Sequence, residues 1–149
     1  MLGPFDAVRP VEEPALGCRI ARVPIRHEIR GALLWIVVDG DYDDAELRAT
    51  WEGAFADPDF REGMLTVIDS RKTLANPSRA GVLERADLLA RLRSRIGPRC
   101  ALVVGDALHY GLGRMLAAFS AESGLEIQVF DDPARAEAWV AGAAGAPRR

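Results

Sequence analysis

The chain has 149 residues, of which 49% are hydrophobic and 28% charged, and its formal net charge at pH 7 is −3. That length is enough for one domain with a sizeable core, and the composition is that of an ordinary globular protein. The slight negative charge gives no bulk attraction to polyanions, so we expect neither a nucleic acid nor a membrane as partner.

The cysteines and histidines predict no metal or cofactor site. Cys18 and Cys100 are far apart and form no CxxC pair, and His27 and His109 are the only histidines. A structural zinc site is therefore not expected. This use of cysteine is typical of a reducing, cytoplasmic setting. The longest apolar run, residues 32–38, is too short to span a bilayer.

The sequence pattern divides the chain into three segments. Residues 1–17 contain Pro4, Pro10 and Pro14 among few periodic apolar positions, which predicts a flexible arm. Residues 18–141 carry the periodic patterns and are predicted to form a single domain. Residues 142–149 consist of Gly, Ala, Pro and Arg, and are predicted to form a flexible tail.

The first elements are a hairpin and a helix. Residues 18–28 are strand-like, Gly31 supplies a turn, and residues 32–38 form an almost continuous apolar run that is typical of an interior strand. Asp43 and Glu46 have the spacing of a capping box. We expect the helix that follows to bury Leu47 and Trp51.

A central strand with its helix, and then two further strand–helix pairs, complete the pattern. Residues 64–68 are predicted as a buried strand with Asp69 at its carboxyl end, followed by a polar loop and a helix that opens near residues 76–78. Its apolar repeat runs on to Ile96, and Arg85 and Arg91 are assigned to its solvated face. A strand at 100–104, a helix from about 107, a strand at 127–130 and a helix opening at Pro133 follow.

Strands that alternate with helices predict an α/β fold. We expect a mixed, mostly parallel sheet of about five strands, with the opening pair as an antiparallel hairpin at one side, and about four helices.

Short motifs connect this order of elements to a known fold. They are VVGD at residues 103–106, VFD at 129–131 followed by EAWV at 137–140, and Asp69 at the end of the third strand. With the initial hairpin, they resemble the STAS fold (sulfate transporter and anti-sigma-factor antagonist). The chain is most similar to the SpoIIAA-like branch, which occurs as small stand-alone bacterial proteins. The similarity extends over roughly residues 19–140.

The resemblance implies a regulatory role and a place for a phosphosite. In anti-sigma-factor antagonists, a kinase phosphorylates a serine in an Asp-Ser-Ser-Gly stretch at the start of the helix after the third strand. Here residues 76–79, Asn-Pro-Ser-Arg, occupy that stretch. Ser78 is kept, proline replaces the phosphorylated serine, and the Asp and Gly do not match. Ser78 is thus a candidate phosphosite, and Ser70 is a second one.

Four aspartates stand at predicted carboxyl ends of strands, and they have two interpretations. Asp39, Asp69, Asp106 and Asp131 could together hold Mg²⁺, or each could cap the next helix. Capping is favoured because Asp strongly prefers these positions. The first interpretation corresponds to a metal-dependent phosphoryl enzyme, which requires at least two of these carboxylates to converge.

The leading hypothesis is a non-enzymatic, cytoplasmic regulatory module, with no catalytic residue. We expect it to contact a protein partner, or a second copy of itself, through the loop at residues 69–79 and the start of the helix that follows it. The predicted contact residues are Asp69, Ser70, Arg71, Asn76, Ser78, Asp106 and His109.

The alternative is a binding protein for a small apolar or lipid-like molecule. Such a ligand would lie between the sheet and the helices that bear Trp51 and Phe119. A large apolar cavity at that place would favour this second hypothesis, and a well-packed core would contradict it.

Overall fold

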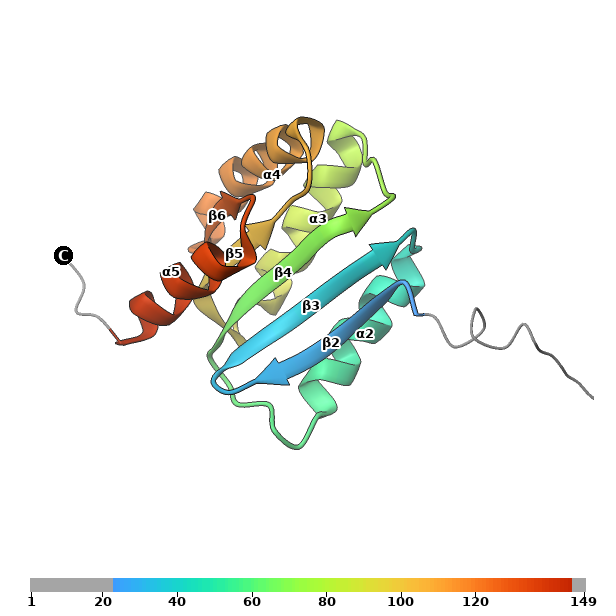
Figure 1. Cartoon of the computed structure of the whole chain (residues 1–149). Coiled ribbons are helices and arrows are strands. Elements are labelled where there is room, and N and C mark those ends of the chain that lie inside the picture. The colour runs from blue at the N-terminus through green and yellow to red at the C-terminus, as the bar shows by residue number, and fades with distance from the viewer. Residues whose placement is uncertain (1–22, 146–149) are drawn as a thin grey trace, which may run out of the picture.

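The computed structural model describes residues 23–145 (Figure 1). The predicted arm at residues 1–17, the first part of the predicted first strand and residues 146–149 lie outside the described residues. In the described part of the chain, no helix is both long and apolar enough to cross a membrane.

A five-stranded sheet forms the centre of the domain, with strand order β2-β3-β4-β5-β6. The strands are β2 (Ile25–Arg30), β3 (Leu33–Gly40), β4 (Met64–Thr73), β5 (Ile96–Val103) and β6 (Glu126–Phe130). The β2 and β3 strands are antiparallel, and each later pair is parallel. Gly31, with φ of 60°, lies in the two-residue loop that joins β2 to β3, where a positive φ suits a tight hairpin. The predicted mixed sheet with a hairpin at one side is confirmed.

Helices cover both faces of the sheet. They are α2 (Asp44–Ala56), α3 (Arg79–Leu92), α4 (Ala107–Ser120) and α5 (Pro133–Gly145), with a short 3₁₀ turn, η1 (Ala121–Ser123), after α4. One core holds Trp51, Val82 and Leu116 from α2, α3 and α4. The core on the opposite face holds Ala136 and Val140 from α5. Figure 1 shows α5 in front of the sheet and α2 behind it.

The predicted start of α2 is confirmed in detail. The backbone N–H of Glu46 donates to the Asp43 carboxylate at 2.8 Å, and the Glu46 side chain accepts from the backbone N–H of Asp43 at 2.9 Å. Two otherwise unpaired donors at the helix end are thereby satisfied. Trp51 is buried as expected, and Leu47 is half-buried at the edge of the same core.

The end of α3 differs from the prediction. The helix ends at Leu92, and Ile96 starts β5 and pairs with Met64. The start of β5 packs closely against the segment that leads into β4, since a Cβ on Gly97 would meet the carbonyl oxygen of Gly63 at 2.6 Å. The register of β4 and β5 is irregular here, which suits Pro98 because proline cannot donate to a ladder.

Two further bounds differ from the sequence expectation. The β4 strand runs to Thr73, so that residues 69–73 are part of the strand and not of the loop. The α5 helix runs to Gly145, past the predicted domain end at residue 141, so the first residues of the predicted flexible tail are helical. Three of residues 141–145 are alanine, the best helix former, and the helix extends over the two glycines among them.

Candidate functional site

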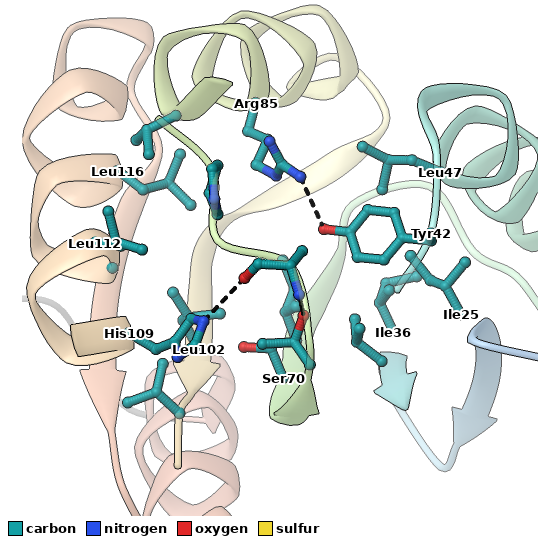
Figure 2. A pocket seen from close by; sticks show the side chains of 18 of the residues that line it. Ile25, Ile36, Tyr42, Leu47, Ser70, Arg85, Leu102, His109, Leu112 and Leu116 are labelled. Carbon is teal, nitrogen blue, oxygen red and sulfur yellow. Dashed lines mark hydrogen bonds between the residues drawn. The ribbon is translucent and has the colours of Figure 1, made fainter. Parts of the chain in front are cut away.

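An apolar cavity of about 120 Å³ lies between the sheet and helices α2, α3 and α4 (Figure 2). It is found at the carboxyl end of the parallel strands, where ligands bind in many open α/β sheets. Its apolar wall consists of Ile25, Ile36, Val38, Leu47, Trp51, Ile68, Val82, Leu88, Leu89, Leu102, Val104, Leu112 and Leu116. Trp51 thus contributes to the wall as expected. Phe119 instead packs against the guanidinium of Arg79, with 5.2 Å between that group and the ring centroid.

The polar lining of the cavity is small. It comes from Tyr42 after β3, Ser70 and Thr73 on β4, Arg85 on α3 and His109 on α4. In residues 23–145, no Asp or Glu side chain lines the cavity. An apolar space with a few convergent polar groups is the usual form of a small-molecule site.

Arg85 and Tyr42 meet on one side of this cavity, as Figure 2 shows. The Arg85 guanidinium donates from Nη2 to the Tyr42 hydroxyl at 3.3 Å and from Nη1 to the carbonyl oxygen of Gly81 at 3.2 Å. It also lies over the Tyr42 ring, with 5.6 Å to the centroid. The stacked pair joins α3 to the segment between β3 and α2.

His109 forms a link on another side of the cavity. Its Nδ1 contacts the Asp106 carboxylate at 2.8 Å, and its Nε2 contacts the carbonyl oxygen of Ala75 at 2.9 Å. Because both partners are acceptors, a doubly protonated ring satisfies both contacts. The hydrogen bond to Ala75 and, more weakly, the Asp106 carboxylate raise the pKa of His109, against the opposing effect of burial. The ring therefore ties the start of α4 to the loop that follows β4.

Asp106 also caps the helix that bears His109. Its carboxylate accepts the backbone N–H of His109 at 2.8 Å and so caps α4. This backbone hydrogen bond and the contact with the His109 ring hold the pKa of Asp106 below its usual range. The capping interpretation is confirmed for this residue.

Asp69 and Arg71 lie on the opposite face of the sheet. Side chains alternate along a strand, and both residues are in phase with Leu65 and Val67, which pack toward α5. Arg71 donates from Nε and Nη2 to the two oxygens of Asp69 at 2.9 and 2.8 Å. Burial opposes the ionisation of Asp69, but these hydrogen bonds outweigh it and lower its pKa. The pair is thus separated from the cavity by the sheet.

The remaining predicted contact residues lie at the carboxyl edge. Ser70 lines the cavity, and its hydroxyl donates to the carbonyl oxygen of Val103 at 3.0 Å. Asn76 and Ser78 are exposed, and the Ser78 hydroxyl caps α3 by accepting the backbone N–H of Gly81 at 3.2 Å. The structure therefore brings Ser70 and His109 to the cavity and leaves Asn76, Ser78 and Asp106 at its rim or on the surface.

Sequence reasoning missed Tyr42, Thr73 and Arg85, and it assigned Arg85 to the solvated face of its helix. The spacing held a signal for Arg85. It follows Val82 by three residues and precedes Leu89 by four, so it shares their face of the helix. A single charged residue on an otherwise apolar face of a helix breaks the pattern, and such a break marks a candidate site.

The strand-end aspartates do not form a metal cluster in the described part of the chain. No group of three or more His, Cys, Asp or Glu side chains is placed there to hold a metal ion. Asp106 caps α4, and Asp132, the neighbour of Asp131, accepts the backbone N–H of Ala134 at 3.0 Å at the start of α5. Asp69 is held by Arg71 on the other face of the sheet.

Comparison with known proteins identifies the fold. No family model and no curated protein matches the sequence. Among solved structures, the chain is similar to an uncharacterised protein from Shewanella loihica PV-4, which is described as a member of the DUF3478 family with a SpoIIAA-like fold. The identity is 17%, the TM-score is 0.55, and the match covers 78% of this chain and 91% of that one. The resemblance that the sequence motifs indicated is therefore confirmed at the level of architecture, and the chain has a SpoIIAA-like fold.

Proposed function

We propose that this protein is a non-enzymatic binding module that holds a small molecule with an apolar body in the cavity between the sheet and helices α2 to α4. The observation that carries the proposal is the cavity itself, with a volume of about 120 Å³ and an almost wholly apolar wall. For comparison, an engineered apolar cavity of about 150 Å³ in another protein stays dry and binds benzene.

The energetics favour an apolar occupant. Each CH₂ group that moves from water into such a cavity contributes about 0.8 kcal/mol, so a body of roughly six carbons gains several kcal/mol before the cost of immobilisation. An empty cavity leaves its wall without partner atoms on one side. Leu112 and Leu116 on α4, Leu89 on α3 and Trp51 on α2 would all gain contacts with such a ligand.

Native mass spectrometry of the purified protein, read beside the denatured mass, tests this proposal. We expect extra mass on the folded protein that is lost on denaturation, or binding of added 1-octanol to the empty protein. The variant Ala75→Trp places a large side chain at a residue that lines the cavity and should abolish both. Ala80→Trp, at an exposed position on α3, is the matched control and should leave them unchanged. A folded protein that carries no added mass and does not bind octanol would contradict the proposal.

A second candidate function is the regulatory protein-interaction module, placed in the cytoplasm, that the fold suggests. Two large apolar side chains support it, because Leu74 is 72% exposed and Leu108 is 58% exposed. They directly precede Ala75 and His109, which a hydrogen bond joins, so both residues lie at the carboxyl edge, where we predicted a contact surface. A second copy of the chain is the simplest partner.

Sedimentation at increasing protein concentration tests this second candidate. We expect a monomer–dimer equilibrium that the double variant Leu74→Ser, Leu108→Ser shifts to monomer. Leu83→Ser, at a 39% exposed leucine on α3, is the control and should leave the equilibrium unchanged. A monomer at every concentration would rule out self-association through this edge.

A further inference from the structure

Resting on the proposed function, we infer that the ligand is a small amphipathic anion. Its head, a carboxylate or a group of similar chemistry, binds Arg85 and Tyr42, and its apolar body fills the cavity. The inference goes beyond an apolar site because it assigns a charge to the ligand and a recognition role to two residues that the sequence did not single out.

Arg85 is a half-buried cation whose hydrogen-bond partners are neutral. It is half-buried in the cavity wall, and its guanidinium donates hydrogen bonds to two neutral oxygens, those of Gly81 and Tyr42. No carboxylate of the described residues lies within ion-pair distance of its guanidinium. Two other arginines of the domain, by contrast, have such partners: Arg71 pairs with Asp69 at 2.8 Å and Arg95 with Glu62 at 2.7 Å. A partly desolvated cation is stabilised by an anion that can reach it.

Arg85 and Tyr42 retain hydrogen-bond donors that can contact a ligand. Arg85 has five N–H donors, of which two are used in the contacts with Gly81 and Tyr42. The Tyr42 oxygen accepts from Arg85, so its own O–H remains able to donate. One acceptor group beside this pair can therefore receive both an N–H and an O–H hydrogen bond. A carboxylate, with two oxygens that each accept more than one hydrogen bond, matches this donor set.

The ionisable side chains that line the cavity favour an anion over a cation. The ionisable side chains of the cavity are Tyr42, Arg85 and His109, and the contacts of His109 favour its protonated form. Within the described residues no acidic side chain lines the cavity, so nothing there repels an anion. Asp44, Glu84 and Asp87 line a separate polar depression that Arg85 also borders. Because their carboxylates stand outside the apolar cavity, they do not occupy the place of the ligand's head.

The size of the site limits the body of the ligand. A volume of about 120 Å³ suits a single ring or a chain of roughly six to seven carbons. Octanoate is therefore a suitable anionic probe, and 1-octanol is its neutral counterpart with the same carbon chain. At neutral pH a carboxylic acid is ionised, so the two probes differ in the charge of the head.

Calorimetric titration of both probes into the wild-type protein and its variants tests the inference. We expect octanoate to bind the wild type more tightly than octanol does. Arg85→Gln should weaken octanoate binding about tenfold or more and leave octanol binding within about twofold, since a charge-assisted hydrogen bond is lost only with the anion. Arg91→Gln removes the same charge from an exposed position of the same helix, away from the cavity, and should change neither affinity.

The outcomes separate the inference from the function on which it rests. If both probes bind equally and Arg85→Gln changes neither, the cavity is a ligand site but the anion inference is wrong. If neither probe binds the folded wild type, the proposed function fails and the inference fails with it. If Arg85→Gln does not fold, Tyr42→Phe removes one donor and keeps the ring, and it should still weaken octanoate selectively.

Discussion

The Nε2 atom of His109 lies 2.9 Å from the carbonyl oxygen of Ala75, across 34 residues of sequence. Nδ1 of the same ring contacts the Asp106 carboxylate at 2.8 Å. The His109 side chain is 13% exposed, so this link is shielded from solvent on most of its surface. It fastens the loop between β4 and α3 to the start of α4, and both His109 and Ala75 line the cavity. The stability of this loop should therefore depend on pH.

The direction of that dependence follows from two opposite shifts. The pKa of His109 is raised from 6.5, so its protonated form stabilises the native state below pH 6.5, and the effect is lost as pH rises through the raised value. The pKa of Asp106 is lowered from 3.8, so its ionised form stabilises above pH 3.8, and the effect is lost as pH falls through the lowered value. The link should be strongest between these limits.

Urea unfolding of the wild type and of His109→Gln measures this effect. We expect the difference in unfolding free energy between the two proteins to be larger at about pH 5.5 than at about pH 9, because the neutral ring can donate to only one of its two acceptors. A difference that is equal at both pH values, or larger at the higher one, would show that the protonated ring does not hold the loop.

Replacing Asp69 should destabilise the fold without affecting the cavity. Asp69→Ala removes a 9% exposed carboxylate and leaves Arg71 without its bidentate partner, which should cost about 1–3 kcal/mol of unfolding free energy. Glu62→Ala breaks the exposed pair with Arg95 and should cost at most about 1 kcal/mol. Because Asp69 faces α5, octanol binding should persist in both variants. Loss of binding in folded Asp69→Ala would contradict the separation of the two faces.

A methylene added to each face of the sheet should have opposite effects. Val38 on β3 lines the cavity, so Val38→Ile has room to bury its extra group and should leave stability unchanged or raise it by up to about 1 kcal/mol. Val67 on β4 is fully buried in the core under α5, so Val67→Ile should overpack it and cost about 1–3 kcal/mol. Thermal unfolding of the two variants makes the comparison. A penalty of equal size in both would mean that the cavity is closed in solution.

Two glycines near the start of α4 should respond in opposite ways to substitution by alanine. A Cβ on Gly105 would lie 2.7 Å from the carbonyl oxygen of Arg71, so Gly105→Ala must displace the backbone and should cost about 1–3 kcal/mol. Gly111 lies inside α4 with nothing within 4 Å of the added atom, so Gly111→Ala should stabilise by about 0.5–1 kcal/mol. Denaturant unfolding decides both signs. A stable Gly105→Ala protein would show that β4 and the turn after β5 are not held this closely.

Several features of the architecture follow from local patterns in the sequence. The capping box of Asp43 and Glu46, the apolar run that became β3 and the aspartate that caps α4 were all predicted, because caps and strand alternation depend on residues close in the chain. The order of these elements was enough to indicate the SpoIIAA-like fold, which the structural comparison confirmed.

The site, in contrast, was decided by tertiary structure. The sequence predicted that Asp69, Ser70 and Arg71 would belong to one loop, but β4 continues through them, because its last residues, Lys72 and Thr73, pair with the end of β3. Once they are part of a strand, successive side chains must point to opposite faces, so Ser70 reaches the cavity and its neighbours face α5. Likewise, Arg85 lines the cavity beside Tyr42, a residue 43 positions away in the chain. Local preference determines which segments become helices and strands, whereas pairing and packing between distant segments determine which side chains share a space.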